Sequence, residues 1–316
     1  MTEIGVDTGA QPSPATGDHL LRAGRYTANV DEIGATLRAL RFDDRDLVVP
    51  YPAGTVRPLY RGATVAPWPN RIQNGRYTFA GQDFQLAINE VDRGHALHGL
   101  VQWVRFGVTE RATDRITLRH DLVPQDGYPF GLRLTVTSTL TADGLTTTLS
   151  AVNTGATPVP YGCCPHPYLL AGPGTVDDWT LRMAADRRLE VDERLIPTGT
   201  THVAGVDNDF RLGSLIGSRE IDHAFTALGR DGQRRAAIEV TGAAGDGVRL
   251  SFGEWAPWVQ IHTADRPEPE WNRSGLAVEP MSCPPNAFNS GTDVVVLAPG
   301  EHHEAEWTIS AVTGTP

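Results

Sequence analysis

The sequence predicts an all-β protein, folded as a large antiparallel β-sandwich or a barrel. Apolar and polar residues alternate with period two through most segments, which is typical of strands with one buried face. The chain contains 33 glycines and 23 prolines, and they separate these short alternating runs. No long stretch carries the apolar stripe of an amphipathic helix. These three observations together favour an all-β class.

Turn residues between alternating runs predict individual hairpins. The turns are expected at 31–34, at 81–82 and at Asp143-Gly144. An Asp-Gly pair between alternating runs is among the strongest short hairpin signals. The runs that flank the three turns are 20–30 and 35–42, 76–79 and 84–88, and 132–136 and 145–152. Further strands are expected at 116–122, 237–240, 248–252, 259–262, 276–278, 294–297 and 304–311.

The chain is expected to form one domain from 19 to 316 after a flexible tail at 1–18, because no repeat or change of composition marks a second domain. The tail lacks the basic start and apolar core of a signal peptide, and no apolar run approaches membrane-spanning length. Three cysteines, of which Cys163 and Cys164 are adjacent, do not form a disulfide framework. We therefore expect a cytoplasmic protein with reduced, buried thiols.

The charge pattern bears on the partners of the protein. All 27 basic residues are arginine, the net charge is −11, and both signs are spread along the chain. Nucleic acids and anionic membranes require a clustered basic surface, so neither is an expected partner. The expected partner is a small molecule, and the expected oligomeric state is a monomer or a weak homodimer.

His166 lies in an unusual local sequence. Pro165 and Pro167 restrict its backbone on both sides, which excludes a regular helix, and Pro167 lacks the N–H that a central strand requires. A histidine in this setting is often structural, held at a strand end by a carbonyl. Cys163 and Cys164 beside it resemble metal ligands only loosely, because the cysteines of structural zinc sites are usually two to four residues apart. Neither a metal nor a cofactor is expected.

Four other polar residues lie beside expected strand ends. Arg71 follows the rigid sequence Pro-Trp-Pro, and His98 lies between a leucine and a glycine. Asp222 precedes a histidine, and Glu279 ends an apolar run directly before Pro280. Each has an ordinary structural interpretation, as a surface ion pair, a loop histidine, a turn former or a solvent-facing strand end. Trp68 is a candidate apolar wall for a ligand.

Taken in order, these short motifs resemble the aldose 1-epimerase (galactose mutarotase) family over residues 20–312. No single motif is specific, but six occur in the right order at similar intervals. The six are Pro-Asn-Arg-Ile at 69–72, Leu-His-Gly at 97–99 with Trp103 after it, Val-Asn-Thr-Gly at 152–155, His-Pro-Tyr at 166–168, Asp222, and Val-Glu-Pro at 278–280. The chain differs from the usual family pattern at Leu100, Leu169 and the Cys163-Cys164 pair.

The resemblance implies a β-sandwich of the galactose mutarotase type, whose concave face binds a free hexose such as glucose or galactose. It implies that His166 is the general acid and Glu279 the general base. It also implies that Arg71, His98 and Asp222 hold sugar hydroxyls. The expected reaction interconverts the α and β anomers by opening and reclosing the ring, without a cofactor.

Three other functions remain open at this stage. The first is a non-catalytic sugar-binding or sensing protein on the same fold, although a pure binder needs no acid–base pair. The second is a hexose-6-phosphate 1-epimerase, which would need further cationic groups such as Arg57 and Arg61. The third is a glycoside hydrolase, which normally needs two carboxylates, whereas only Glu279 is a strong candidate.

Overall fold

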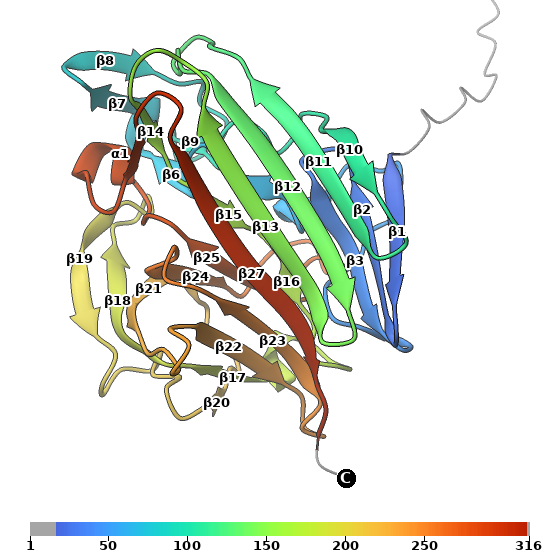
Figure 1. Cartoon of the computed structure of the whole chain (residues 1–316). Coiled ribbons are helices and arrows are strands. Elements are labelled where there is room, and N and C mark those ends of the chain that lie inside the picture. Colours follow the sequence, from blue (N-terminus) through green and yellow to red (C-terminus); the bar gives the residue numbers. More distant parts are fainter. Residues whose placement is uncertain (1–16, 315–316) are drawn as a thin grey trace, which may run out of the picture.

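The computed structural model describes residues 17–314 and confirms the all-β prediction. Its strands form two large antiparallel sheets with smaller ladders around them (Figure 1). Within the described residues the only α-helix is the short α1 (Ala287–Ser290), and no helix is long and apolar enough to cross a membrane. The tail predicted at 1–18 falls largely outside the described residues, and β1 begins at Asp18.

The larger sheet has nine strands in the order β10-β11-β12-β13-β27-β23-β22-β17-β20. Figure 1 shows β12, β13 and β27 as long strands lying side by side, although β27 is the last strand of the chain. The strands are β10 (Gly107–Arg111), β11 (Arg115–Leu122), β12 (Leu132–Thr141), β13 (Gly144–Asn153), β17 (Thr180–Met183), β20 (Ser214–Leu215), β22 (Ala236–Thr241), β23 (Gly247–Phe252) and β27 (His302–Val312).

The smaller sheet has six strands in the order β16-β25-β24-β21-β18-β19. Its strands are β16 (Tyr168–Leu169), β18 (Ala185–Val191), β19 (Pro197–His202), β21 (Asp222–Leu228), β24 (Trp258–His262) and β25 (Leu276–Met281). All six residues of β25 are buried, because one of its faces meets the core and the other forms the floor of a cleft. This sheet positions most of the candidate site.

A four-stranded sheet and several two-stranded ladders complete the fold. The four-stranded sheet contains β1 (Asp18–Ala23), β2 (Tyr26–Asp31), β3 (Thr36–Phe42) and β4 (Arg45–Asp46). The ladders pair β14 (Val159–Tyr161) with β26 (Val295–Leu297), β15 (Cys164–Pro165) with β5 (Thr64–Val65), β6 (Arg71–Ile72) with β9 (Ala96–Leu97), and β7 (Arg76–Phe79) with β8 (Gln82–Gln85). Short 3₁₀ turns are η1 (Pro58–Tyr60), η2 (Gln73–Gly75) and η3 (Val176–Asp178).

The period-two pattern of the sequence places the core between the two large sheets. Strands β12 and β13 alternate buried and partly exposed residues along almost their whole length. Such alternation buries one face of a sheet and leaves the other accessible to water. The buried face of the nine-stranded sheet and residues of the six-stranded sheet, such as Phe225 and Ile261, belong to one continuous apolar cluster.

All three predicted hairpins are confirmed, but the first run needs correction. β2 pairs with β3 across the predicted turn, with Asp31 opposite Thr36. β7 and β8 pair across the turn at Gly81, and β12 pairs with β13 across Asp143 and Gly144. The run 20–30 was expected to be one strand and is instead a hairpin of β1 and β2, with its turn at Gly24-Arg25. Gly24 has a φ of 55°, a left-handed conformation that glycine adopts without strain.

The region from β17 to β21 was not anticipated from the sequence. β19 contains no large apolar residue, and most of its residues are exposed. Adjacent polar residues interrupt the alternation of β18. These strands therefore form through backbone hydrogen bonds to neighbouring strands. Their own side-chain pattern does not predict strands.

Candidate active site

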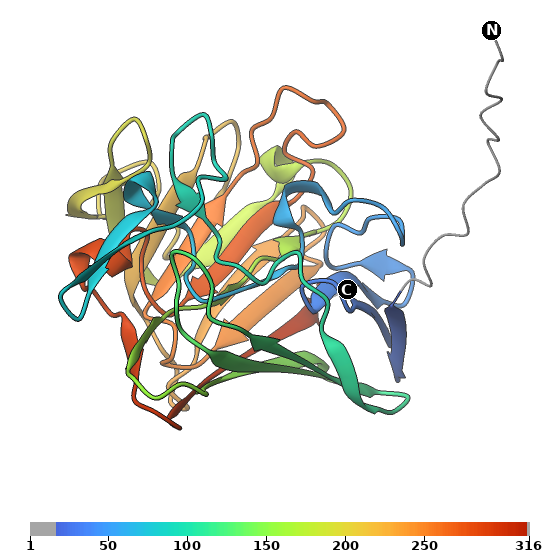
Figure 2. The same ribbon diagram turned by 90° about the horizontal axis from the view of Figure 1, so that it is seen from above.

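A cleft of about 710 Å³ opens over the six-stranded sheet. Figure 2 shows loops rising on the side of this sheet that faces away from the long strands of the nine-stranded sheet. The cleft contains all five predicted site residues, namely Arg71, His98, His166, Asp222 and Glu279. Other lining residues include Tyr60, Asn70, Glu90, Arg93, Tyr168, Gln260, His262 and Arg266. Residues more than 200 positions apart in sequence therefore line one cavity.

His166 is held by its backbone in the connection between β15 and β16. Its N–H donates to the carbonyl of Ala63 and its carbonyl accepts from the N–H of Gly62. Pro165 and Pro167 have no N–H to donate, so His166 supplies the only backbone donor of residues 165–167. The imidazole stacks on Tyr168, with ring centroids 5.5 Å apart and ring planes 19° apart. His166 as a whole is only 4% exposed.

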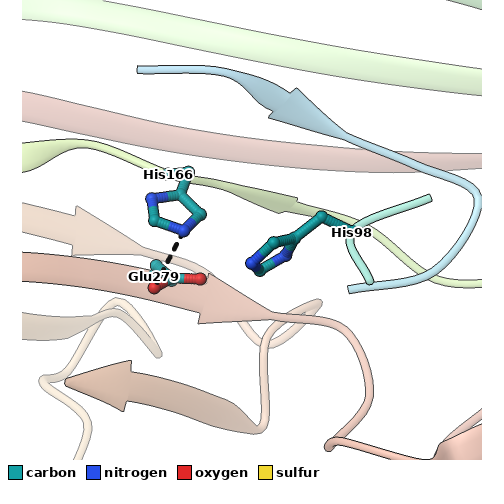
Figure 3. Close-up of side chains that lie close together, drawn as sticks. All are labelled: His98, His166 and Glu279. Atoms are coloured by element: carbon teal, nitrogen blue, oxygen red, sulfur yellow. Dashed lines mark ion pairs between the residues drawn. The ribbon is translucent and has the colours of Figure 1, made fainter. Parts of the chain in front are cut away.

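Glu279 lies on β25, beside His166. Strand β25 pairs with β16, with Ala277 opposite Tyr168, and this pairing brings the two candidates together. The Nε2 atom of His166 is 3.4 Å from the Oε1 atom of Glu279 (Figure 3). Glu279 is 2% exposed. The predicted acid and base are therefore direct neighbours on the floor of the cleft.

His98 points toward the same pair from a separate segment of the chain, as Figure 3 shows. Its φ is 60°, an unusual left-handed conformation for a residue with a side chain, and its N–H donates to the carbonyl of Asn70. Gly99 follows with a φ of 72°, and a Cβ atom there would lie 2.1 Å from the carbonyl oxygen of Ala66. The Leu-His-Gly motif therefore has a physical reason, since only glycine fits after the histidine.

Arg71 is oriented by the side chains around it. Its Nε and one terminal nitrogen donate to the two carboxylate oxygens of Glu90, each at 2.9 Å, and its other terminal nitrogen donates to Asn70 Oδ1 at 3.2 Å. A guanidinium has five N–H groups, so two of those on Arg71 remain available to a ligand. Arg93 also pairs with Glu90, at 3.1 Å. Sequence reasoning missed Glu90 because no local motif marks it.

Asp222 belongs to a second polar group, on neighbouring strands. It faces His262 across the pairing of β21 with β24, and its Oδ1 accepts from Gln260 Nε2 at 2.6 Å. Gln260 in turn lies opposite Glu279 across the pairing of β24 with β25. The buried Oε1 of Gln260 has no hydrogen-bond partner among residues 17–314, so it is available to a ligand hydroxyl. Gln260 and His262 were also missed, although His262 ends a strand that the sequence predicted.

Burial shapes the electrostatics of the acid–base pair. Desolvation raises the pKa of Glu279 well above its usual value, and the nearby Asp222 carboxylate adds to this shift. Desolvation lowers the pKa of His166 to about 3. It also lowers the pKa of His98 well below its usual value, with the neighbouring His166 as a smaller cause. The buried site therefore favours an uncharged carboxyl beside uncharged imidazoles.

The aromatic residues that line the cleft are not the one expected from the sequence, which was Trp68. Tyr60 and Tyr168 line the cleft, whereas Trp68 does not line it and is buried against Tyr128 and Phe288. The three cysteines are free and buried, as expected. Burial raises the pKa of the Cys163 thiol to about 12, so this cysteine is unreactive.

Arg57 and Arg61, the candidate phosphate ligands, do not line the cleft. Arg57 is buried and donates to Thr36 and to the carbonyl of Gln102. Arg61 donates to Ser274, at 2.9 Å. Both arginines are engaged in the structure of the surrounding loops.

The cluster of His98, His166 and Glu279 also has the chemical composition of a metal site. One potential ligand atom from each residue lies within 4.8 Å of the others. Two imidazoles and one carboxylate are a ligand set that zinc accepts. The same three groups suit proton transfer and hydroxyl binding, which need no ion.

Comparison with known proteins identifies the class of this fold. A solved structure described as a GalM/aldose epimerase homologue from C. elegans superimposes with a TM-score of 0.83 at 24% identity, covering 95% of this chain and 100% of the other. The structure of galactose 1-epimerase from Lactobacillus acidophilus gives a TM-score of 0.77 at 21% identity, covering 94% and 95%. These likenesses show a galactose mutarotase-like sandwich.

Sequence comparison takes the assignment further. The family model for aldose 1-epimerase matches residues 18–310. An uncharacterised protein of Escherichia coli K12, YihR, is 36% identical over 290 residues, which cover 92% of this chain and 91% of YihR. Rat galactose mutarotase is 30% identical over 317 aligned positions, which cover 90% of each chain. The chain belongs to the aldose 1-epimerase family.

Proposed function

We propose that this protein interconverts the α and β anomers of a free hexose such as glucose or galactose. The observation that carries the proposal is the contact of His166 with Glu279, 3.4 Å apart on the floor of an open cleft. The two oxygens that exchange protons in this reaction, O1 and the ring oxygen O5, are both bonded to C1. A base for one and an acid for the other must therefore be close neighbours, as these two side chains are.

The proton balance of the pair suits the reaction. One shared proton, placed on His166, leaves Glu279 as a carboxylate and His166 as an imidazolium. Glu279 takes the proton from O1 while the C1–O5 bond breaks, and His166 delivers its proton to O5. The ring opens to an aldehyde, the C1–C2 bond rotates, and the opposite face of the C1 carbonyl is presented to O5 for reclosure. Reclosure reverses both proton transfers and restores the pair.

Burial would stabilise the central intermediate of this sequence. After ring opening, Glu279 is a neutral acid and His166 a neutral imidazole. This is the protonation state that desolvation favours, because it raises the pKa of Glu279 and lowers that of His166. The charged pair that is required for ring opening has the same number of protons and the same net charge as this neutral pair. Moving between the two states therefore requires no proton from solvent.

Three further groups are proposed to hold the sugar hydroxyls. Arg71 offers two free N–H groups as donors, His98 offers a ring nitrogen, and Asp222 offers carboxylate oxygens as acceptors. Gln260 adds an amide oxygen between Asp222 and Glu279. A hexose presents hydroxyls around its whole ring, and these groups surround the acid–base pair from several strands and loops.

The charge of the cleft bears on the phosphate alternative. Six carboxyl groups line it, on Glu90, Asp92, Glu220, Asp222, Asp265 and Glu279, whereas the lining arginines are Arg71, Arg93 and Arg266. Two of these arginines already pair with Glu90. This balance favours an uncharged sugar over a hexose 6-phosphate. Arg266 is the cation that would contact a phosphate.

Polarimetry tests the proposal directly. Freshly dissolved α-D-glucose, α-D-galactose and glucose 6-phosphate should be followed with catalytic amounts of protein, with and without a chelator. We expect faster relaxation of the optical rotation for at least one neutral sugar, unaffected by the chelator. Relaxation of all sugars at the buffer rate would refute the enzymatic proposal and favour a sugar-binding protein. Loss of activity with the chelator would show that a metal takes part.

A further inference from the structure

The imidazole of His98 is buried, and its Nδ1 atom has no hydrogen-bond partner among residues 17–314. Figure 3 shows this ring pointing toward His166 and Glu279, and its centroid lies 4.9 Å from that of the His166 ring. Buried polar groups in folded proteins nearly always have a hydrogen-bond partner. An unpartnered imidazole that points toward a histidine and a glutamate therefore indicates a place prepared for a ligand.

The spacing of His166 and Glu279 fits two ligands of one zinc ion. Zn²⁺ binds nitrogen and oxygen atoms at about 2.0–2.2 Å in tetrahedral geometry, so two of its ligand atoms lie about 3.3–3.5 Å apart. The Nε2 atom of His166 and the Oε1 atom of Glu279 are 3.4 Å apart. This pair can therefore share an ion without a change in its separation.

His98 completes a set of three ligands. One potential ligand atom from each of His98, His166 and Glu279 lies within 4.8 Å of the others, so the third ligand needs to approach by at most about 1.5 Å. Among residues 17–314 this is the only group of three such side chains. Two histidines and one glutamate are the protein ligands of some catalytic zinc sites, where a fourth position stays open.

The charge of the cleft favours a cation at this point. Six carboxyl groups line the cleft, against three arginines. Arg71 is the arginine whose charge acts on Glu279, and it is already paired with both carboxylate oxygens of Glu90. The carboxylate of Asp222 is close enough to raise the pKa of Glu279. Asp222 therefore adds to the attraction for a cation bound at Glu279.

We propose that His98, His166 and Glu279 bind one zinc ion, which inhibits the protein by competing with the sugar. The metal site stands on these three side chains, whereas the inhibition rests on the proposed epimerase function. The ion occupies the lone pairs of His166 and Glu279 that carry protons during ring opening. The Nδ1 atom of His166 has no acceptor among residues 17–314, although zinc-bound imidazoles normally have one. The ion is therefore held reversibly, as an inhibitor and not as a resident cofactor.

Calorimetric titration with zinc chloride tests the site independently of activity. The protein is first freed of metal with a chelator, which is then removed. We expect one zinc ion per chain to bind at micromolar concentrations. Glu279→Gln and His98→Asn should each weaken this binding at least about tenfold, because an amide is a poor zinc ligand. Asparagine is chosen because it tolerates the left-handed φ of 60° at position 98. Absence of binding, or equal affinity in the wild type and both variants, would overturn the site.

A matched variant distinguishes the site from zinc bound at the surface. His302→Ala removes an exposed histidine on β27, where His303 and Glu304 lie beside it. The zinc affinity of this variant should equal that of the wild type. Loss of binding in His302→Ala would mean that the ion lies on the surface and would overturn the proposal.

Polarimetry in the presence of zinc tests the inhibition. The KM of the accelerated sugar should rise with the zinc concentration while kcat stays constant, and addition of the chelator should restore the original rate. Magnesium prefers six oxygen ligands in octahedral geometry, so the same concentration of magnesium chloride should not inhibit. Zinc binding without inhibition, a fall in kcat at constant KM, or equal inhibition by magnesium would refute competition at this site.

The failure of the zinc site can be distinguished from the failure of the proposed function. If the protein accelerates mutarotation but binds no zinc, the epimerase function stands and the zinc site is wrong. If it accelerates the mutarotation of no sugar, the epimerase function is wrong and the titration still decides the site. Zinc binding that is lost in Glu279→Gln would then support the site, whereas binding equal to that of the wild type would refute it.

Discussion

Glu90 accepts a hydrogen bond from Arg71 on each of its carboxylate oxygens, both at 2.9 Å, and both side chains are largely buried. Two parallel hydrogen bonds fix the plane of a guanidinium as well as its position. Glu90 lies on the loop between β8 and β9, where a bridge to His95 closes the loop. This loop acid therefore sets the direction in which Arg71 faces the cleft.

The first prediction concerns this ion pair. Glu90→Gln should raise KM about tenfold with a smaller change in kcat, because an amide cannot accept both hydrogen bonds and Arg71 loses its fixed orientation. Arg71→Ala should raise KM at least as much. Initial rates from polarimetry over a range of sugar concentrations give both constants. Glu110→Gln is the control, since it breaks an ion pair of exposed side chains. Equal constants for Glu90→Gln and the wild type would contradict the positioning role.

The second prediction separates catalysis from binding. Glu279→Gln keeps the shape of the side chain but removes the base, and His166→Asn removes the imidazole. General acid–base groups contribute about 10²–10⁴ in rate each, so kcat should fall by that factor while KM changes less. Single-turnover measurements by polarimetry check this. A Glu279→Gln variant with nearly wild-type kcat would mean that the base is another residue, and Asp222 would be tested next.

The third prediction is a bell-shaped pH dependence of kcat/KM. Activity requires the pair of His166 and Glu279 to hold one proton. It should fall at low pH, where the pair gains a second proton, and at high pH, where it loses the last one. Both limbs belong to the coupled pair and not to either residue alone. In His166→Asn the bell should be lost together with most of the rate. A wild-type profile that is flat across both limbs would contradict the shared-proton scheme.

The fourth prediction concerns stability. Because folding raises the pKa of Glu279, the folded state holds this proton more tightly than the unfolded state does. The contribution to stability is therefore fully present below the unfolded pKa of about 4.5 and is lost as pH rises towards the folded value. Glu279→Gln has no such loss. Its Tm relative to the wild type should increase as pH rises above about 4.5, as calorimetry would measure.

A matched variant controls for the general effect of removing a carboxyl. Glu304→Gln changes an exposed glutamate on β27, and its Tm should run parallel to that of the wild type across the same pH range. The burial of His166 acts in the opposite direction, because its lowered pKa costs stability as pH falls below about 6.5. A constant Tm difference between Glu279→Gln and the wild type would show that Glu279 is not perturbed by burial.

The fifth prediction tests the backbone of the Leu-His-Gly motif. Gly99 and Gly81 both have positive φ, at 72° and 77°, but only Gly99 packs against another segment, the carbonyl of Ala66. Gly81→Ala should cost about 1 kcal/mol in the free energy of unfolding, from backbone strain alone. Gly99→Ala should cost roughly 1–3 kcal/mol more, because the added methyl group displaces backbone. Denaturant titrations measure both, and equal costs would contradict the packing argument.

Local patterns were sufficient to predict the all-β class and most strands of the nine-stranded sheet. Alternation with period two depends only on which side chains face the core, so it is visible in a single strand such as β12 or β13. The turn at Gly24 was missed because the alternation continues on both sides of it. The strands β18 and β19 were missed because their own residues carry little apolar pattern.

The identities of the five candidate residues were likewise predictable, because each lies in a short motif whose order along the chain resembles one family. The tertiary structure decided how they meet. His166 contacts Glu279 only because β16 pairs with β25, and Asp222 faces His262 only because β21 pairs with β24. Glu90, Gln260 and Tyr60 carry no local signal, since each acquires its role from a partner on another strand or loop. Strand pairing over long sequence separations is specified by packing of the whole core, which no local pattern records.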